Sequence, residues 1–369
     1  MTGMVSSPRR GRIDTLEVAR AVAAIAVVAF HSNTVANANY ADIPTYSILD
    51  LGERGVDFFF VLSGFIMMYS GGRFLGEKKE FLPFVRRRFL RLYPVLWVVV
   101  VLSLIGNLLI DGQGPKTGTL VTSLTLLPSL DVPNPPVIWT LRHEVMFYAL
   151  FALVILSRKA GGALIGLWFV GIAFQTVQHL SGQAGLTGLY AFVFSPINLQ
   201  FFMGALIGWI YLRGYQVNGL LVFTLGLTAL VLFSALTVYA GVPTREVFDY
   251  NVPHEALWDI LFGLAFMVVV LGLAELNKNT KMLSLLVFLG AASYAIYLVH
   301  LPVMGLVGRL SANIVPDFIT TVGGAQILLM IAAILAGSLL HIAFEQPFAK
   351  LARTYFFPRP AKTAPQDNL

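Results

Sequence analysis

Two ionisable residues, Arg20 and His31, lie eleven positions apart in a segment that is otherwise strongly apolar. An α-helix turns about 100° per residue, so both side chains point to nearly the same face, about 16 Å apart along the axis. An arginine near the centre of a bilayer costs about 2.5–3.5 kcal/mol on insertion scales. Membrane helices keep such residues where they have a partner or a function, so we expect this helix to line a reaction site.

Three further ionisable residues, Asp57, Glu144 and His300, each lie near one end of another apolar segment. If successive segments cross a membrane in alternating directions, these residues and His31 all lie at a similar depth, in the outer half of the bilayer. A histidine held by a carboxylate is the usual general base for removing a proton from a hydroxyl group. The arrangement predicts that four segments converge on one site at which a hydroxyl group can react.

A second group of ionisable residues consists of Arg86, Arg87, Arg88 and Arg91. Arg88 and Arg91 are three residues apart and share one face of a helix. Guanidinium groups bind phosphates through paired hydrogen bonds, so this pair is a candidate phosphate site. Arg20 lies in the inner half of its segment and extends the positive path into the protein.

Each of these residues also has a structural interpretation. A basic segment on the inner side of a membrane is usually a topology signal alone. His31 can be a hydrogen-bonded packing residue, and Asp57 can cap the start of its helix. Glu144 can form an ion pair with Arg142. The catalytic interpretation therefore depends on whether several of these residues meet at one site.

The composition is that of an integral membrane protein, because 57% of the residues are hydrophobic and only 12% are charged, against roughly 25% charged residues in soluble domains. The sequence contains no cysteine, which excludes a disulfide, a thiol nucleophile and a cysteine-ligated metal. Its six histidines show no metal-ligand spacing, so we expect no metal. The net charge of +6 would suit nucleic acid, but its distribution indicates membrane topology instead.

The chain contains about ten apolar segments of helical length, separated by clusters of Gly, Pro, Asn and Lys. Each is close to the ~20 residues that span a bilayer, the second being shorter. We therefore predict an all-α, polytopic membrane bundle. The expected spans are 16–36, 55–70, 92–110, 138–157, 162–179, 193–212, 219–240, 255–274, 284–305 and 323–344.

Basic residues lie mostly on one side of this expected topology, which places both termini in the cytoplasm. The first segment has the basic start of a signal peptide, but Arg20 fits such a peptide poorly and cleavage would break the charge pattern. We therefore expect it to be retained. The expected parts are a basic cytoplasmic segment at 1–12, a transmembrane domain at 13–347 and a disordered cytoplasmic tail at 348–369. Of the 25 Lys and Arg residues, the outer segments hold only Arg54, Lys116, Arg245 and Arg309.

Six motifs, in order along the chain, resemble those of the acyltransferase 3 family of membrane acyltransferases. The most specific is GVDFFFVLSGF at 55–65. The first motif runs from 16–24 to Phe30-His31 and contains Arg20, with a departure at Glu17-Val18-Ala19, where the family usually has a small or Leu-rich stretch. The resemblance covers nearly the whole chain. The remaining motifs are 88–94, 139–148, 290–300 and 345–347.

The resemblance implies a cytoplasmic acyl-CoA donor, most often acetyl-CoA, and a carbohydrate hydroxyl as the acceptor at the outer side. On this basis Arg88 and Arg91 bind the CoA phosphates, and the pantetheine arm passes Arg20. Members of this kind that have a single domain are associated with exopolysaccharide acetylation. We therefore expect a multi-pass protein of the inner membrane that works beside polysaccharide biosynthesis machinery and binds no nucleic acid.

The resemblance also places roles on the outer group of residues. His31 is the expected general base on the sugar hydroxyl or, as an alternative, the nucleophile that accepts the acyl group. Asp57 or Glu144 orients or charges its imidazole. Some relatives carry a fused extracytoplasmic esterase-like domain; this sequence ends 22 residues after Pro347, so we expect direct transfer to the final acceptor. Candidates for stabilising the oxyanion or positioning the sugar are Arg142, Tyr148, Ser293, Tyr297 and His300.

Two other classes of protein share some of these features. A transporter or flippase for a polysaccharide precursor or a small molecule commonly has ten spans with buried charges. It has no need of a CoA-phosphate site at Arg88 and Arg91, and the chain shows no paired broken helices in two matching halves. A structural subunit of a polysaccharide export machine would not explain the intramembrane His31 and Arg20.

Overall fold

The computed structural model describes residues 11–40, 44, 46–183, 185–215, 217–245, 252–276, 283–311 and 323–356, which form helices, turns and loops but no strand. Within these residues ten helical segments are long and apolar enough to cross a membrane. The prediction of an all-α, polytopic bundle with about ten spans is therefore confirmed.

The expected spans correspond to long helices in the predicted order. The short helices are α2 (Ser47–Asp50), α5 (Thr117–Thr125), α8 (Gly188–Val193) and α15 (Gln346–Phe356). The long helices are α1 (Asp14–Asn39), α3 (Gly55–Gly71), α4 (Phe81–Asp111), α6 (Trp139–Leu156), α7 (Arg158–Leu180), α9 (Leu199–Leu212), α10 (Gly219–Tyr239), α11 (Pro253–Leu276), α12 (Ser284–Ser311) and α14 (Gly324–Leu340).

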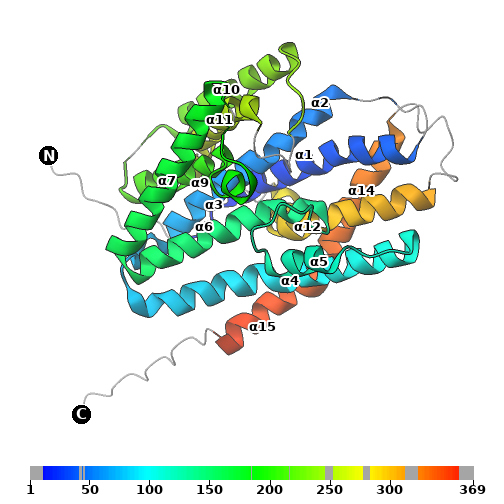
Figure 1. Ribbon diagram of the computed structural model, residues 1–369, viewed down its shortest axis with the longest axis horizontal. Helices are drawn as coiled ribbons and strands as arrows, with labels where there is room; N and C mark the ends of the chain where they lie inside the picture. The colour runs from blue at the N-terminus through cyan, green and yellow to red at the C-terminus, as the bar shows by residue number, and fades with distance from the viewer. Residues whose placement is uncertain are drawn as a thin grey trace.

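Successive long helices alternate in direction, so the bundle has two faces at which helices begin and end (Figure 1). We call one the arginine-rich face; α1 and α4 begin there and α3 ends there, next to Arg73, Arg87 and Arg88. At the opposite face α1 and α4 end, and α3 and α6 begin. In Figure 1 helices α4 and α6 run across the picture, with the arginine-rich face at the left.

Close helix contacts fix the elements that carry the candidate residues. Helix α3 packs against α9, and α1 packs against α12. A Cβ added at Gly204 in α9 would lie 1.8 Å from the carbonyl oxygen of Val61 in α3. One added at Gly290 in α12 would lie 1.9 Å from the carbonyl oxygen of Glu17 in α1. Glycine therefore allows these backbones to approach closely, as at small-residue contacts between membrane helices.

Helix α4 begins at Phe81, well before the expected start of this span at 92. Arg88 and Arg91 therefore lie within a helix and share a face, as their spacing predicts. Arginine and leucine are strong helix formers, and the stem of an arginine can cover apolar surface while its head reaches water. Pro94 lies inside the helix, which continues beyond it to Asp111.

The segment after Pro347, which we expected to be disordered, continues as helix α15. This helix follows α14 through a π-helical turn at His341–Glu345. Its polar and apolar residues lie on different sides, the pattern of a helix at a membrane surface. The expectation was therefore wrong for residues 348–356, whereas residues 357–369 and 1–10 lie outside the described part of the chain.

Candidate active site

Three cavities lie in series between the two faces of the bundle. The arginine pocket, with an empty volume of about 850 Å³, lies at the arginine-rich face. The central pocket has a volume of about 670 Å³, and the histidine pocket, near the opposite face, has a volume of about 550 Å³. Ile66 and Arg91 line the first two pockets, and Val56 and Tyr297 line the last two. Neighbouring pockets therefore adjoin each other across the bundle, and we refer to the series of three as the path.

The arginine pocket is lined by four guanidinium groups, and helix α4 supplies three of them. Arg88 donates from Nη2 to Ser70 Oγ at 3.0 Å, and its guanidinium lies 5.1 Å from the ring centre of Tyr148. Arg91, one turn further along α4, is solvent-exposed and reaches the central pocket. In the described part of the chain no carboxylate lies within 4.0 Å of either guanidinium. The four arginines are Arg73, Arg87, Arg88 and Arg91.

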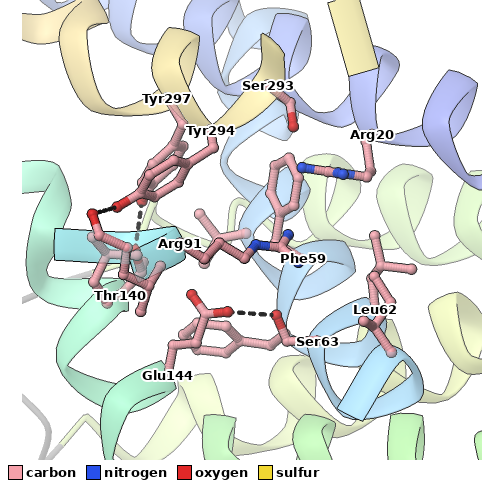
Figure 2. A pocket seen from close by; sticks show the side chains of 15 residues that line it. Arg20, Phe59, Leu62, Ser63, Arg91, Thr140, Glu144, Ser293, Tyr294 and Tyr297 are labelled. Carbon is pink, nitrogen blue, oxygen red and sulfur yellow. Dashed lines mark hydrogen bonds between the residues drawn. The ribbon is translucent and has the colours of Figure 1, made fainter. Parts of the chain in front are cut away.

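The central pocket combines positive and negative groups from several helices (Figure 2). Arg20 of α1 pairs with Glu17 at 3.1 Å, one helical turn away. Glu144 of α6 accepts a hydrogen bond from Ser63 Oγ at 3.1 Å and another from the hydroxyl of Tyr148. Arg91 extends between these two groups in Figure 2. This pocket can therefore hold a polar chain, with charged groups on both walls.

The far wall of the central pocket is supplied by helix α12. The hydroxyls of Tyr297 and Thr140 lie 2.9 Å apart, and Tyr297 donates to the carbonyl oxygen of Val137 at 3.0 Å. The hydroxyl of Ser293 is buried, with no hydrogen-bond partner among the described residues, and Figure 2 shows it turned toward the pocket. An unpartnered buried hydroxyl costs about 1–3 kcal/mol, which a bound polar group would offset.

The histidine pocket contains His31, which is half-buried and lies on the path from the central pocket. Its ring centre lies 5.0 Å from that of His300 and 4.7 Å from that of Phe30. Trp139 lines the same cavity, as do Glu53 and Arg245. The cavity thus offers an imidazole, flat aromatic surface and charged groups at one place.

Arg245, from the segment between α10 and α11, belongs to a buried ionic network behind this cavity. Its Nη2 donates to Asp57 Oδ1 at 3.0 Å and to Asp259 Oδ1 at 2.5 Å. Its backbone N–H donates to Glu53 Oε2 at 2.8 Å. The side-chain amide of Gln200 donates a further hydrogen bond to Asp57 Oδ1.

These carboxylates keep Arg245 charged. Burial disfavours its positive charge, but Asp259, Asp57 and Glu53 outweigh that effect and hold the pKa of Arg245 well above its usual value. In the expected topology this residue was assigned to an outer segment and given no role in the site. One feature of the sequence could have pointed to Arg245: it is an arginine in an outer segment, where the positive-inside rule disfavours basic residues. An arginine kept there is a candidate for a buried ion pair.

The structure separates the four groups that we expected at one site. His31 and His300 meet, but Asp57 binds Arg245 and Gln200. Glu144 lies in the central pocket with Arg20 and Arg91, one cavity nearer the arginine-rich face. Within the described residues no carboxylate lies in hydrogen-bonding distance of the His31 ring. His31 and His300 therefore share one place in the structure, whereas Asp57 and Glu144 face other partners.

Two other expected site residues also have structural partners. Arg142 is buried and donates from Nη1 to the carbonyl oxygens of Ser129 and Asp131, at 3.0 and 2.8 Å. It therefore holds the segment before α6 and lines none of the three pockets. Tyr148 contacts Glu144 and Arg88, so it supports the arginine pocket rather than the outer site.

The described residues contain no group of three or more His, Asp and Glu side chains that could hold a metal ion. The polar groups on the path are arginines, glutamates, hydroxyls and imidazoles. Arginines can bind phosphate, and an imidazole can transfer a proton.

The profile of a family described as an acyltransferase domain matches residues 13–343. The chain therefore belongs to this acyltransferase family, as its motifs indicated. Together with its ten apolar helices, this makes it a multi-pass membrane O-acyltransferase.

Three curated proteins are similar to the chain over most of its length. It is 30% identical over 397 residues to acyltransferase MdmB from Streptomyces mycarofaciens, covering 97% of this chain and 96% of that protein. It is 27% identical over 330 residues to the exopolysaccharide production protein ExoZ from Rhizobium meliloti, covering 82% and 91%. It is 23% identical over 329 residues to the peptidoglycan O-acetyltransferase OatA from Listeria monocytogenes, covering 80% and 50%. No solved structure matches the chain.

Proposed function

We propose that this protein transfers an acetyl group from cytoplasmic acetyl-CoA to a carbohydrate hydroxyl at the outer side of the inner membrane. The observation that carries the proposal is the path of three pockets, which joins Arg88 and Arg91 at one face to His31 near the other. Donor and acceptor can enter it from opposite sides. An exopolysaccharide production protein and a peptidoglycan O-acetyltransferase among the relatives support an acceptor of this class.

The donor fits the first two pockets. Its phosphates bind Arg88 and Arg91, which have no carboxylate within 4.0 Å in the described chain and can form charge-assisted hydrogen bonds. Its flexible arm follows the central pocket, where the Ser293 hydroxyl can bind a polar group of the arm. Arg20 and Glu144 line this stretch and give it polar walls.

The reaction takes place at the wall between the central and histidine pockets. His31 removes the proton from the acceptor hydroxyl, whose oxygen bonds to the acyl carbon as the carbon–sulfur bond breaks. His31 then returns the proton to the departing thiolate. Tyr297 lies on the wall that both pockets share, and its hydroxyl, by turning from the Val137 carbonyl, is our candidate donor to the developing oxyanion. In the alternative order, the acyl group first bonds to the His31 ring.

The acceptor occupies the histidine pocket. Trp139 supplies a flat apolar surface for the face of a sugar ring, and Glu53 and Arg245 supply groups that can bind its hydroxyls. Asp57, through its bond to Arg245, holds this wall in place and does not act on His31. The proposed role of Asp57 thus differs from that expected from the sequence.

The deciding experiment compares the wild-type protein with a His31→Gln variant, purified in detergent. Thiol release from acetyl-CoA is measured with and without a panel of soluble oligosaccharides, and acetyl-CoA binding is measured by calorimetry. We expect His31→Gln to bind acetyl-CoA normally and to lose about 100-fold or more in turnover, the contribution typical of a general base.

The matched control is His143→Gln, which changes a buried histidine that lines none of the three pockets. Its turnover should stay within a few-fold of wild type. Wild-type turnover in His31→Gln would reject the role of His31. A folded wild-type protein that binds no acetyl-CoA would reject the donor.

A further inference from the structure

The ring of His31 lies beside that of another histidine, and within the described residues no carboxylate is hydrogen-bonded to it. The ring centres of His31 and His300 lie 5.0 Å apart, with 37° between the ring planes. We propose that His300 positions His31 for catalysis by accepting a hydrogen bond from the second ring nitrogen of His31. This inference rests on the proposed function, in which His31 is the base.

The hydrogen bond of His300 to the backbone determines its tautomer. Its Nδ1 lies 2.7 Å from the carbonyl oxygen of Tyr297, one turn earlier in α12. A carbonyl oxygen only accepts, so Nδ1 carries the proton and Nε2 of the neutral ring has a lone pair. Nε2 is buried and has no hydrogen-bond partner among the described residues. An acceptor without a donor thus lies beside the catalytic ring.

The carboxylates near this region are engaged elsewhere. Asp57 binds Arg245 and Gln200, and Glu144 accepts from Ser63 and Tyr148. Glu53, which lines the histidine pocket, pairs with Arg54 at 3.0 Å and accepts from the backbone of Arg245. His300 Nε2 is thus an acceptor on a ring beside His31 that no hydrogen bond among the described residues occupies.

The protonation states of the two rings determine how this pair can act. When His31 takes the acceptor's proton on one ring nitrogen, its other N–H turns toward Nε2 of His300. That hydrogen bond holds the ring orientation and spreads the positive charge of the imidazolium. The proton stays on His31 and returns to the departing thiolate, because two charged rings 5.0 Å apart would repel each other strongly in this buried site.

The test uses two substitutions of His300 that differ in one property. His300→Gln keeps a side-chain acceptor, whereas His300→Phe keeps the ring volume without it. We expect His300→Phe to lose about 10- to 100-fold in kcat, the loss typical when a group that orients a metal-ligating histidine is removed. Its KM for acetyl-CoA should not change, and His300→Gln should recover most of the lost kcat.

A purely structural role for His300 would give a different pattern. The matched control is His143→Phe, which alters a buried histidine on α6 whose Nδ1 lies 2.9 Å from Asn198. Equal losses of kcat in His300→Gln and His300→Phe, with the melting temperature lowered as in His143→Phe, would overturn the inference. So would wild-type kcat in His300→Phe.

Failure of this inference is distinguishable from failure of the proposed function. If wild type transfers acetyl groups and His31→Gln does not, the base is established whatever the His300 variants do. If His31→Gln transfers normally, the proposed function fails first, and no positioning residue is needed.

Discussion

The arginines at the two ends of the path differ in their partners, and this difference separates ligand binding from architecture. Arg88 and Arg91 line cavities and have no carboxylate within 4.0 Å in the described chain. Arg54 and Arg245, near the opposite face, pair with Glu53, Asp57 and Asp259. A guanidinium that faces a cavity without a carboxylate can bind an anion that arrives. A guanidinium that is already paired with carboxylates instead has a structural role.

The two groups of arginines also differ in how they relate to the positive-inside rule. Arg88 and Arg91 follow the positive-inside pattern, so the sequence alone cannot tell a phosphate site from a topology signal. Arg54 and Arg245 violate that pattern, and the structure provides the compensation in three buried carboxylates. For these two arginines the departure from the rule coincides with a buried ion pair.

The largest effect is expected from removing both unpaired arginines. The Arg88→Ala/Arg91→Ala variant loses two charge-assisted hydrogen-bonding groups, each worth about 1.5–3 kcal/mol. Its Kd for acetyl-CoA should therefore rise by 100-fold or more, as measured by calorimetry, while its melting temperature changes little. Arg86→Ala, an exposed arginine on the same helix that lines none of the pockets, is the matched control. Wild-type affinity in the double variant would show that acetyl-CoA does not bind at Arg88 and Arg91.

A comparable loss, in stability rather than affinity, is expected at the other end. Arg245→Ala leaves Asp57 and Asp259 buried without their common partner, at a cost of about 3–5 kcal/mol. The variant should unfold at a lower temperature and still bind acetyl-CoA with wild-type affinity. Stability equal to wild type would contradict the view that Arg245 has a structural role.

A smaller effect is expected at the central pocket. Ser293→Ala removes a hydroxyl that has no partner among the described residues, so it should cost no stability. If the donor arm uses this hydroxyl, affinity for acetyl-CoA falls by the worth of one neutral hydrogen bond, about 1 kcal/mol or roughly 5-fold. Ser103→Ala removes a buried hydrogen bond to Asn134 and is the control. It should lower the stability of the protein and leave its affinity for acetyl-CoA unchanged. Unchanged affinity in Ser293→Ala would show that the donor arm does not bind the Ser293 hydroxyl.

Much of the fold could be predicted because a membrane span is a local property. About 20 apolar residues in a row form a helix in a bilayer whatever their neighbours are, so all ten spans were found. The predicted helix ends were less accurate in charged segments, because charge argued against a membrane span although the residues favour a helix. Helix α4 extends back to Phe81 and α15 continues to Phe356, although both segments are rich in charge.

The candidate site could be predicted only residue by residue. Arg88, Arg91 and His31 were predicted from their types and motifs, and in the structure they line adjoining pockets. Asp57 was expected beside His31 because both lie toward the outer end of their helices. Asp57 instead binds Arg245, which lies 188 residues further along the chain.

The sequence by itself determined the class of the protein, its ten helices and the residues able to bind phosphate or move a proton. These follow from hydrophobic length, residue chemistry and motif order, all of which are local. Only the tertiary structure decided which side chains meet: His31 with His300, Asp57 with Arg245, and Glu144 with Ser63. The physical reason is that depth along a helix can be read from one segment, whereas the direction in which a side chain faces depends on how that helix packs against its neighbours.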